Sequence, residues 1–173
     1  ARNIIDEVSE TFIWTDHGKD YGVSRVTWLK KKKEIIYISE QDGWRHLYLV
    51  DVATGKQKQI TKGEYVLRYV DKIDEEKRQI WFRASGRNPK QDPYLIHYYR
   101  INFDGGGLTA LTEGDGTHEV RYSPDRKYLI DTYSRIDMAP VNELRRVSDG
   151  GLVCKLEESD ISQLEASGWE APE

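Results

Sequence analysis

The chain has 173 residues, of which 30 are acidic and 26 basic, so its formal net charge is −4. Because the two signs are mixed and the balance is acidic, the composition excludes a nucleic-acid-binding surface, which needs a basic excess. The length suits one domain with a substantial core, and 5 Trp, 11 Tyr and 3 Phe supply much of that core.

The sequence contains no run of 18 apolar residues and no signal peptide, so we expect no membrane-spanning segment. A single cysteine, Cys154, excludes an intrachain disulfide. It lies in the apolar run from Leu152 to Leu156, where we expect a small core residue. The chain begins with Ala1 rather than Met, which indicates a segment of a longer protein.

Strand patterns begin near the N-terminus. Residues 1–20 are expected to hold the end of one strand unit, and the first complete unit spans residues 24–61. Its clearest strands are 34–40, 44–51 and 57–61, and Asp42-Gly43 is a strong hairpin-turn signal.

The second unit spans residues 65–112. Its apolar and aromatic runs predict four strands, at 65–72, 79–84, 94–103 and 108–112. Between the last two lies Gly105-Gly106-Gly107, which lacks the Lys-Ser/Thr and the helix of a phosphate-binding loop. We therefore predict a hairpin turn there.

The third unit spans residues 118–157, with strands at 118–122, 127–134, 141–148 and 152–156. Ser123-Pro124-Asp125 predicts a type I turn, since proline suits its second position. Residues 158–173 are predicted to be a connector with one helical turn, capped by Ser159 or Asp160 and ended by Gly168.

One strand-turn-strand phrase recurs in all three units, at Leu47–Thr61, Tyr98–Thr112 and Asn142–Glu157. Its turn glycines are Gly55, Gly105 and Gly150, so the period is about 45 to 50 residues, as in β-propeller blades. The predicted fold is all-β, a partial β-propeller of about three to four four-stranded antiparallel blades in one continuous array.

Catalytic chemistry is not evident. No Gly-x-Ser-x-Gly elbow occurs, and no His or Cys pair has metal-ligand spacing, so we predict no catalytic, cofactor-binding or metal-binding residue and no cofactor. The histidines are His17, His46, His97 and His118. His46 and His97 lie within aromatic strands and are predicted to be hydrogen-bonded structural residues rather than catalytic bases.

The charged clusters also favour structural roles. The run from Lys30 to Lys33 is predicted to be a solvated hairpin tip rather than a phosphate site. The pairs Glu75-Glu76 and Glu157-Glu158 flank predicted turns and are expected to be solvated. Two further carboxylates are expected to form ion pairs with nearby arginines: Asp131 and Asp137, with Arg135 or Arg145.

At this point several phrases resemble a known family. SEQDGWRHLYLVD at Ser39–Asp51 is similar to the propeller of dipeptidyl peptidase IV-type serine peptidases, in the prolyl oligopeptidase superfamily. Three other stretches are similar to the bacterial branch of that family: Arg83–Gly105, Tyr122–Asp137 and Pro140–Arg146. The combination of DGWRHLYL with DPYLIHYYR is the most specific part of the resemblance, which extends over nearly the whole chain.

The resemblance implies an eight-bladed propeller that caps an α/β-hydrolase domain. It also implies removal of N-terminal dipeptides, often Xaa-Pro or Xaa-Ala, and a periplasmic or exported location. The hydrolase domain, which supplies the serine, aspartate and histidine, is expected to begin shortly after Glu173. The family's amine-binding Glu-Glu pair lies in a helical insertion, a context that neither Glu75-Glu76 nor Glu157-Glu158 shares, so neither inherits that role.

Two functions follow from the sequence. One is a non-catalytic propeller segment of such a peptidase, with the peptide substrate and the hydrolase domain as partners. The other is a stand-alone propeller-like module that binds a protein partner. Because three or four blades do not close a ring, open edge strands also make self-association through the blade edges a hypothesis.

Overall fold

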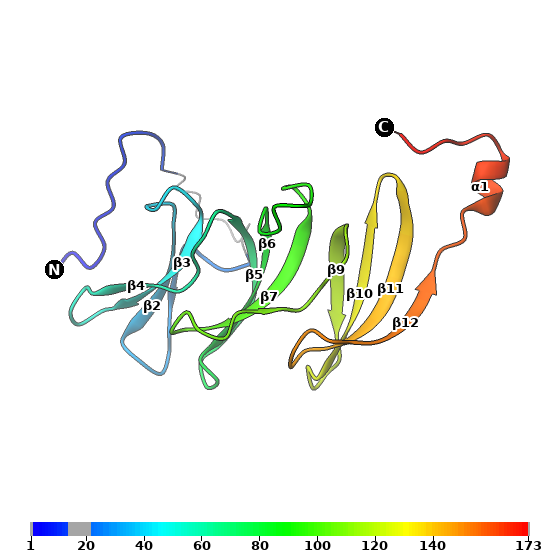
Figure 1. Ribbon diagram of the computed structural model, residues 1–173. Helices are drawn as coiled ribbons and strands as arrows, with labels where there is room; N and C mark the ends of the chain where they lie inside the picture. Colours follow the sequence, from blue (N-terminus) through cyan, green and yellow to red (C-terminus); the bar gives the residue numbers. More distant parts are fainter. Residues whose placement is uncertain (1, 14–21, 173) are drawn as a thin grey trace.

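The computed structural model describes residues 2–13 and 22–172. Within these ranges the chain forms three four-stranded antiparallel sheets, side by side in chain order, and one short helix (Figure 1). The first sheet contains β1 (Val26–Trp28), β2 (Glu34–Ser39), β3 (His46–Asp51) and β4 (Gln57–Gln59). The second contains β5 (Val66–Asp74), β6 (Gln79–Ser85), β7 (Ile96–Asn102) and β8 (Thr109–Ala110), and the third β9 (Thr117–Tyr122), β10 (Tyr128–Arg135), β11 (Met138–Arg146) and β12 (Leu152–Glu158).

Strand order within each sheet follows the sequence, so every strand pairs with its neighbour in the chain. This is the blade-like arrangement predicted from the sequence. Boundaries differ by a few residues. For example, β3 begins at His46 rather than Trp44, because Gly43 adopts a φ of 92° and the Trp44 amide donates to the Asp42 carboxylate. The predicted turn at Ser123 is present, with the Arg126 amide donating to the Ser123 carbonyl oxygen.

The second sheet is covered on one face by the first sheet and on the other by the third. Neighbouring residues on a strand point to opposite sides, so adjacent residues of the second sheet contact different sheets. In β6, Phe82 packs toward the first sheet and Trp81 toward the third. In β7, Tyr99 and Tyr98 divide in the same way. Two inter-sheet cores of different composition result.

The core between the first and second sheets is mainly apolar and aromatic, with the buried ring of His46 packed against Tyr65. The first sheet supplies its side of the core from β2, β3 and the residues that flank the strands: Leu29, Ile36, Ile38, Leu47 and Ile60. The second sheet supplies a larger set: Tyr65, Leu67, Val70, Ile80, Phe82, Ala84, Tyr99, Ile101 and Phe103. Burial of this surface is the main force that holds the two sheets together.

The apolar core between the second and third sheets is smaller. Its buried members are Trp81, Tyr98, Leu111, Leu129 and Val147. Buried charged side chains from the third sheet share this interface, among them Asp131 and Arg145. The interface therefore depends on polar contacts as well as apolar burial.

The repeated glycines explain how successive units fit together. Gly55, Gly105 and Gly150 all have a positive φ, of 77°, 81° and 73°. A β-carbon at Gly150 would lie 2.0 Å from the Ala110 carbonyl oxygen, and one at Gly105 would lie 3.0 Å from that of Ile60. Each turn thus rests against the backbone of the preceding unit, where only glycine is accommodated without strain.

The same relation extends to the N-terminal segment. A β-carbon at Gly55 would lie 3.4 Å from the carbonyl oxygen of Ile4, and Ile4 and Ile5 pack against the apolar face of the first sheet. Residues 2–13 contain no strand, yet Ile4 occupies the place that Ile60 and Ala110 hold before the later sheets. Residues 14–20 of the predicted partial unit 1–20 lie outside the described residues.

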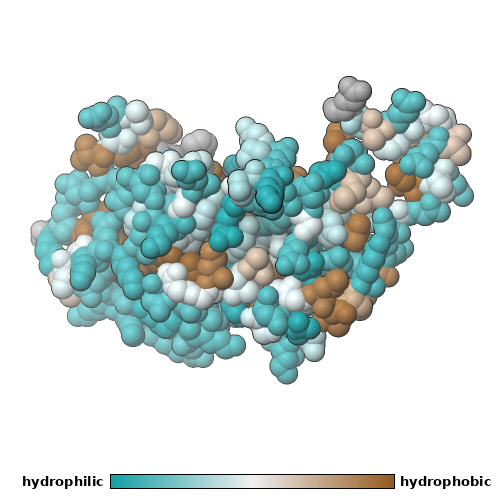
Figure 2. Space-filling model, viewed as in Figure 1, coloured by the Kyte–Doolittle hydropathy of each residue, from teal (hydrophilic) through white to brown (hydrophobic). Residues whose placement is uncertain are grey.

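The prediction for Cys154 is wrong, because this residue is exposed rather than buried in the core. It lies in β12, an edge strand that pairs only with β11 and in which every residue is exposed. The apolar side chains of Leu152, Val153 and Leu156 are about half exposed. Figure 2 shows apolar atoms gathered over the lower part of the third sheet, amid a largely hydrophilic surface.

The C-terminal segment projects away from the third sheet (Figure 1). Its helix, α1 (Ser162–Ala166), begins later than predicted, and its N-cap is Ile161 rather than Ser159 or Asp160. The Asp160 carboxylate still accepts the Ser162 amide at 2.9 Å, and Gly168 follows the helix with a φ of 89°, as expected of a glycine at a helix end. Among the described residues, no helix has the length and apolar character needed to cross a membrane.

Candidate functional site

The most unusual group of side chains is a buried charged cluster between the second and third sheets. It combines His97 from β7, His118 from β9, Asp131 from β10, and Glu143 and Arg145 from β11. In the third sheet Asp131 is paired with Glu143 across β10 and β11, and the alternation of the strands turns these side chains toward the second sheet. We call this group the inter-sheet cluster.

Asp131 is the centre of the inter-sheet cluster and has no exposed surface. One carboxylate oxygen lies 2.8 Å from His118 Nδ1, and the other lies 3.4 Å from Arg145 Nε. Burial raises the pKa of Asp131, while the hydrogen bond from His118 and the charges of His118 and Arg145 act in the opposite direction. The carboxylate is thus held between two cationic or potentially cationic groups.

Arg145 connects the inter-sheet cluster to its surroundings. Its Nε and Nη2 donate to Glu143 Oε2 at 2.9 and 2.7 Å, and its Nη1 donates to the Gly150 carbonyl oxygen at 3.0 Å and to Glu113 at 3.2 Å. Such charge-assisted contacts satisfy a buried guanidinium. The expected pairing of Asp131 with Arg145 is confirmed, and so is that of Asp137 with Arg135, at 2.8 Å.

His97 completes the inter-sheet cluster from the second sheet. Its ring centroid lies 4.5 Å from that of His118, and its Nε2 lies 2.9 Å from the Gln91 amide oxygen. Burial, and then the neighbouring His118, lower the pKa of His97 to about 4. His97 is therefore neutral at pH 7.

This arrangement does not suit nucleophilic catalysis. An Asp–His pair needs a hydroxyl or thiol on the second ring nitrogen, but His118 Nε2 faces the Gly114 carbonyl oxygen at 3.4 Å. The nearby Tyr133 hydroxyl donates to Glu143, and burial and the Glu143 charge raise the pKa of Tyr133. Over the described ranges, no group of three or more His, Cys, Asp or Glu side chains could hold a metal ion. The inter-sheet cluster is a hydrogen-bonded group of the third sheet that meets the second sheet through the ring contact of His118 with His97.

His46 occupies a similar place in the first sheet. It is fully buried, with Nδ1 3.0 Å from Thr61 Oγ1 and Nε2 2.9 Å from the Gly63 carbonyl oxygen. The predicted hydrogen bonding of His46 and His97 is therefore confirmed. His17 lies outside the described residues.

Sequence reasoning missed a repeated His–Thr pair. His46 meets Thr61 in the first sheet, and His97 lies 3.5 Å from Thr112 in the second. Each threonine hydroxyl also accepts an amide of the third strand, from Leu47 at 2.9 Å and from Tyr98 at 3.1 Å. The signal was present in the first two recurring phrases, since each of them is preceded by histidine and ends in threonine, whereas the third is preceded by Val141 and ends in Glu157.

The remaining charged clusters differ in part from expectation. Lys30 to Lys33 form the exposed turn between β1 and β2, as predicted. Glu75, however, is not simply solvated, because its carboxylate accepts the amides of Lys30 and Lys31 at 3.1 and 3.0 Å. These hydrogen bonds lower the pKa of Glu75 and tie the second sheet to the first. Gly105 to Gly107 form the predicted turn between β7 and β8, and Glu157 and Glu158 are exposed on β12.

Comparison with known families identifies the fold. The model of the dipeptidyl peptidase IV (DPP IV) N-terminal region matches residues 1–140, most of the chain. The chain belongs to this family. The match covers all of the first and second sheets and the start of the third.

Relatives of the chain include fungal proteins named dipeptidyl peptidase 4. That of Trichophyton equinum is 27% identical over 160 residues, covering 91% of this chain and 18% of the relative. That of Arthroderma otae is 28% identical over 148 residues, covering 84% of this chain and 18% of the relative. The chain thus spans about a fifth of the length of these relatives.

Solved structures support the same fold. Porphyromonas gingivalis dipeptidyl peptidase 4 is similar with a TM-score of 0.58 and 23% identity, over 83% of this chain and 19% of that one. A putative dipeptidyl aminopeptidase IV from Bacteroides ovatus gives a TM-score of 0.59 and 20% identity, over 78% and 22%. At these identities the likeness shows the fold alone, a set of blades as in the DPP IV propeller.

Proposed function

We propose that the chain is a non-catalytic propeller segment of a DPP IV-like serine exopeptidase, in which it shapes and gates the substrate cavity. The observation that carries this proposal is the family match over residues 1–140. Three successive blade-like sheets, and an inter-sheet cluster without a nucleophile, support a scaffold role.

The chemistry belongs to a hydrolase domain elsewhere in the full-length protein. A serine there would attack the carbonyl carbon of the second residue, with histidine as base, and the rest of the peptide would leave as the amine. Water would then hydrolyse the ester and release the N-terminal dipeptide, often Xaa-Pro or Xaa-Ala. The propeller would contribute by excluding folded proteins and by holding the peptide in a reactive orientation.

The open face of the third sheet supports a role within a larger array. In β12, Leu152, Val153 and Leu156 remain about half exposed, and Ile130 of β10 is 40% exposed. Each earlier sheet buries such side chains against its neighbour, so the third sheet has the surface to receive another blade. The same exposed edge is also suited to self-association of the chain.

Gating of the substrate cavity is tested by comparing release of the same N-terminal dipeptide from a free peptide and from a folded protein. The full-length protein is incubated with an Xaa-Pro peptide and with a folded protein that carries the same residues close to its surface. We expect dipeptide release from the peptide and none from the folded protein until that protein is denatured. Equal release from both would contradict gating, and no release from any substrate would contradict the peptidase assignment.

The exposed edge of β12 also keeps the alternative function open, a stand-alone module that binds a protein partner. The gene beyond Glu173 distinguishes the two. A Gly-x-Ser-x-Gly motif within the next few hundred residues supports the peptidase, and a stop codon supports the module.

A bacterial origin and a periplasmic or exported location are part of the proposal and rest on the family resemblance. Cell fractionation with an antibody against the chain tests the location, and recovery in the cytoplasmic fraction alone would contradict it.

A further inference from the structure

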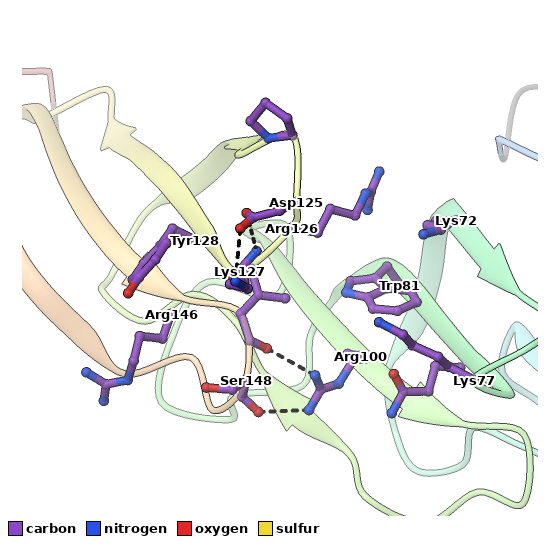
Figure 3. Close-up of a pocket in the computed structure, with 13 residues that line it drawn as sticks. Lys72, Lys77, Trp81, Arg100, Asp125, Arg126, Lys127, Tyr128, Arg146 and Ser148 are labelled. Atoms are coloured by element: carbon purple, nitrogen blue, oxygen red, sulfur yellow. Dashed lines mark hydrogen bonds and ion pairs between the residues drawn. The ribbon is translucent and has the colours of Figure 1, made fainter.

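A second feature also lies between the second and third sheets. It is a cavity of about 570 Å³ formed by β5, β6 and β7 of one sheet, by the ends of β10 and β11 of the other, and by the turns β5–β6, β9–β10 and β11–β12 (Figure 3). Its volume falls in the range of small-molecule sites. We call it the basic cavity.

The basic cavity is strongly cationic, although the chain as a whole has a net charge of −4. Six of its thirteen lining residues are lysine or arginine, and only Asp125 is acidic. The six cationic residues come from five separate segments of the two sheets: Lys72, Lys77, Arg100, Arg126, Lys127 and Arg146.

Three of these cations form no ion pair with a described carboxylate. Lys72, Lys127 and Arg146 have partners, in Asp74, Asp125 and Asp149. Arg100 donates only to neutral oxygens, including the carbonyls of Val147 at 3.2 Å and Ser148 at 2.8 Å (Figure 3). Lys77 and Arg126 have no described carboxylate within ion-pair distance. The positive charge that remains favours an anion.

Nitrogen atoms at the basic cavity are also left without acceptors. Trp81 is only 4% exposed, and its Nε1 has no hydrogen-bond partner among the described residues. Arg100 Nε and Arg126 Nη1 are also buried and have no hydrogen-bond partner among the described residues. An unsatisfied buried donor costs about 1–3 kcal/mol, and more when the group is charged. Three such donors lie beside one cavity and come from two sheets, so a bound acceptor that reached them after small side-chain shifts would relieve this cost.

The surroundings of Arg126 strengthen this point. The carboxylate of Asp71 attracts Arg126 from beyond ion-pair distance. Its Oδ1 accepts two hydrogen bonds from Arg83, at 2.9 and 2.7 Å, and its Oδ2 has no partner among the described residues. Arg126 instead lies over the rings of Tyr122, at 4.5 Å, and Trp81, at 6.0 Å. Its guanidinium is held in place by aromatic contacts and keeps a donor available.

We propose that the basic cavity binds a phosphate or sulfate group. A tetrahedral oxyanion has several oxygens that accept hydrogen bonds. It can therefore accept hydrogen bonds from Trp81, Arg100 and Arg126, which approach from different directions. Guanidinium groups form strong charge-assisted hydrogen bonds with such anions. A planar carboxylate has only two oxygens and satisfies these donors less completely.

The test is titration of the full-length protein with inorganic phosphate, and separately with inorganic sulfate and acetate, followed by calorimetry at low ionic strength. We expect saturable binding of phosphate or sulfate, one per chain, and weaker binding of acetate. The double variant Arg126→Gln with Lys127→Gln is expected to weaken binding at least about tenfold. Lys77→Gln with Lys127→Gln changes only exposed lysines, so it tests the same cavity if the first variant fails to fold.

A matched control is Lys62→Gln with Lys90→Gln. Both lysines are exposed and lie in loops at the other end of the sheets, so they remove the same charge from a different place. The affinity of this control should stay within about twofold of the unmodified protein. No saturable binding up to about 10 mM, an equal loss in the control, or tighter binding of acetate would each overturn the proposal.

Discussion

The two faces of the second sheet are held by different forces. Toward the first sheet, its side chains form a continuous apolar core that includes Leu67 and Phe82. Toward the third sheet, a small apolar group around Leu129 is accompanied by the inter-sheet cluster and the basic cavity. One sheet thus has an apolar interface and a polar interface on opposite sides of the same strands.

The two interfaces should therefore differ in how strongly their stability depends on pH and salt. Apolar burial depends little on pH or salt, whereas buried ion pairs depend strongly on the protonation of each partner. We therefore expect the first and second sheets to behave as one stable unit, and the third sheet to respond first when solution conditions change.

Matched leucine truncations compare the two cores directly. Leu67 is fully buried in the apolar interface, and Leu129 is 1% exposed in the polar interface. We expect Leu67→Ala to lower the free energy of unfolding by about 4 kcal/mol and Leu129→Ala by about 3 kcal/mol, because the smaller core can relax around the lost side chain. Urea unfolding of the full-length protein measures both, and the reverse order would break the comparison.

Contact between the third and second sheets also depends on Gly150. The variant Gly150→Ala would place a β-carbon 2.0 Å from the Ala110 carbonyl oxygen at a φ of 73°, so we expect a loss of about 3 kcal/mol. Gly43→Ala is the control, since Gly43 has a φ of 92° but no atom near its would-be β-carbon, and it should lose about 1 kcal/mol. Equal losses would show that backbone conformation, rather than sheet contact, selects glycine.

The pH dependence should come from the polar interface. The pKa of His97 is lowered to about 4 in the folded protein, so the unfolded chain binds a proton first as the pH falls below about 6.5. Stability contributed by neutral His97 is therefore present at pH 7 and lost between about pH 6.5 and 4. We expect a loss of about 3 kcal/mol over that window.

The variant His97→Gln is the control for this effect, because it removes the titrating ring and retains hydrogen-bonding groups. Unfolding measured from pH 7 to pH 4 should show a flatter dependence in the variant than in the unmodified protein. An unchanged slope would mean that another group titrates in this range.

The smallest effect is expected for the ion pair between Arg78 and Glu34, which joins the first and second sheets. Arg78 joins Glu34 of the first sheet and lies 4.4 Å over the ring of Phe103. Because both charged side chains are partly exposed, we expect Arg78→Gln to cost about 1 kcal/mol. A loss as large as that of Leu67→Ala would contradict the view that this interface is held by apolar burial.

The sheets could be predicted from the sequence because their signals are local. Alternating aromatic strands and the turn residues Asp42-Gly43 and Ser123-Pro124 each specify a short stretch of chain. The repeated turn glycines indicated the length of the repeating unit. The contact of Gly105 with Ile60 supplies a physical reason for that period, since each glycine fits against the preceding unit.

The environment of side chains was harder to predict, because it depends on which sheet covers which face. Cys154 lies in a run that reads as a core strand, yet no described sheet packs on β12. The basic cavity was not predicted at all, because Arg100, Arg126 and Arg146 come together only when the second and third sheets meet. The inter-sheet cluster was predicted in part, through the pairing of Asp131 with Arg145, but not its contact with His97.

The central claim is that the chain contributes structure, and not chemistry, to a dipeptidyl peptidase. The most direct measurement incubates the 173-residue chain and the full-length protein separately with a chromogenic Xaa-Pro substrate. We predict turnover by the full-length protein, abolished by a serine-directed inhibitor, and no turnover by the chain alone. Inhibitor-sensitive turnover by the chain alone, or none by the full-length protein, would contradict the claim.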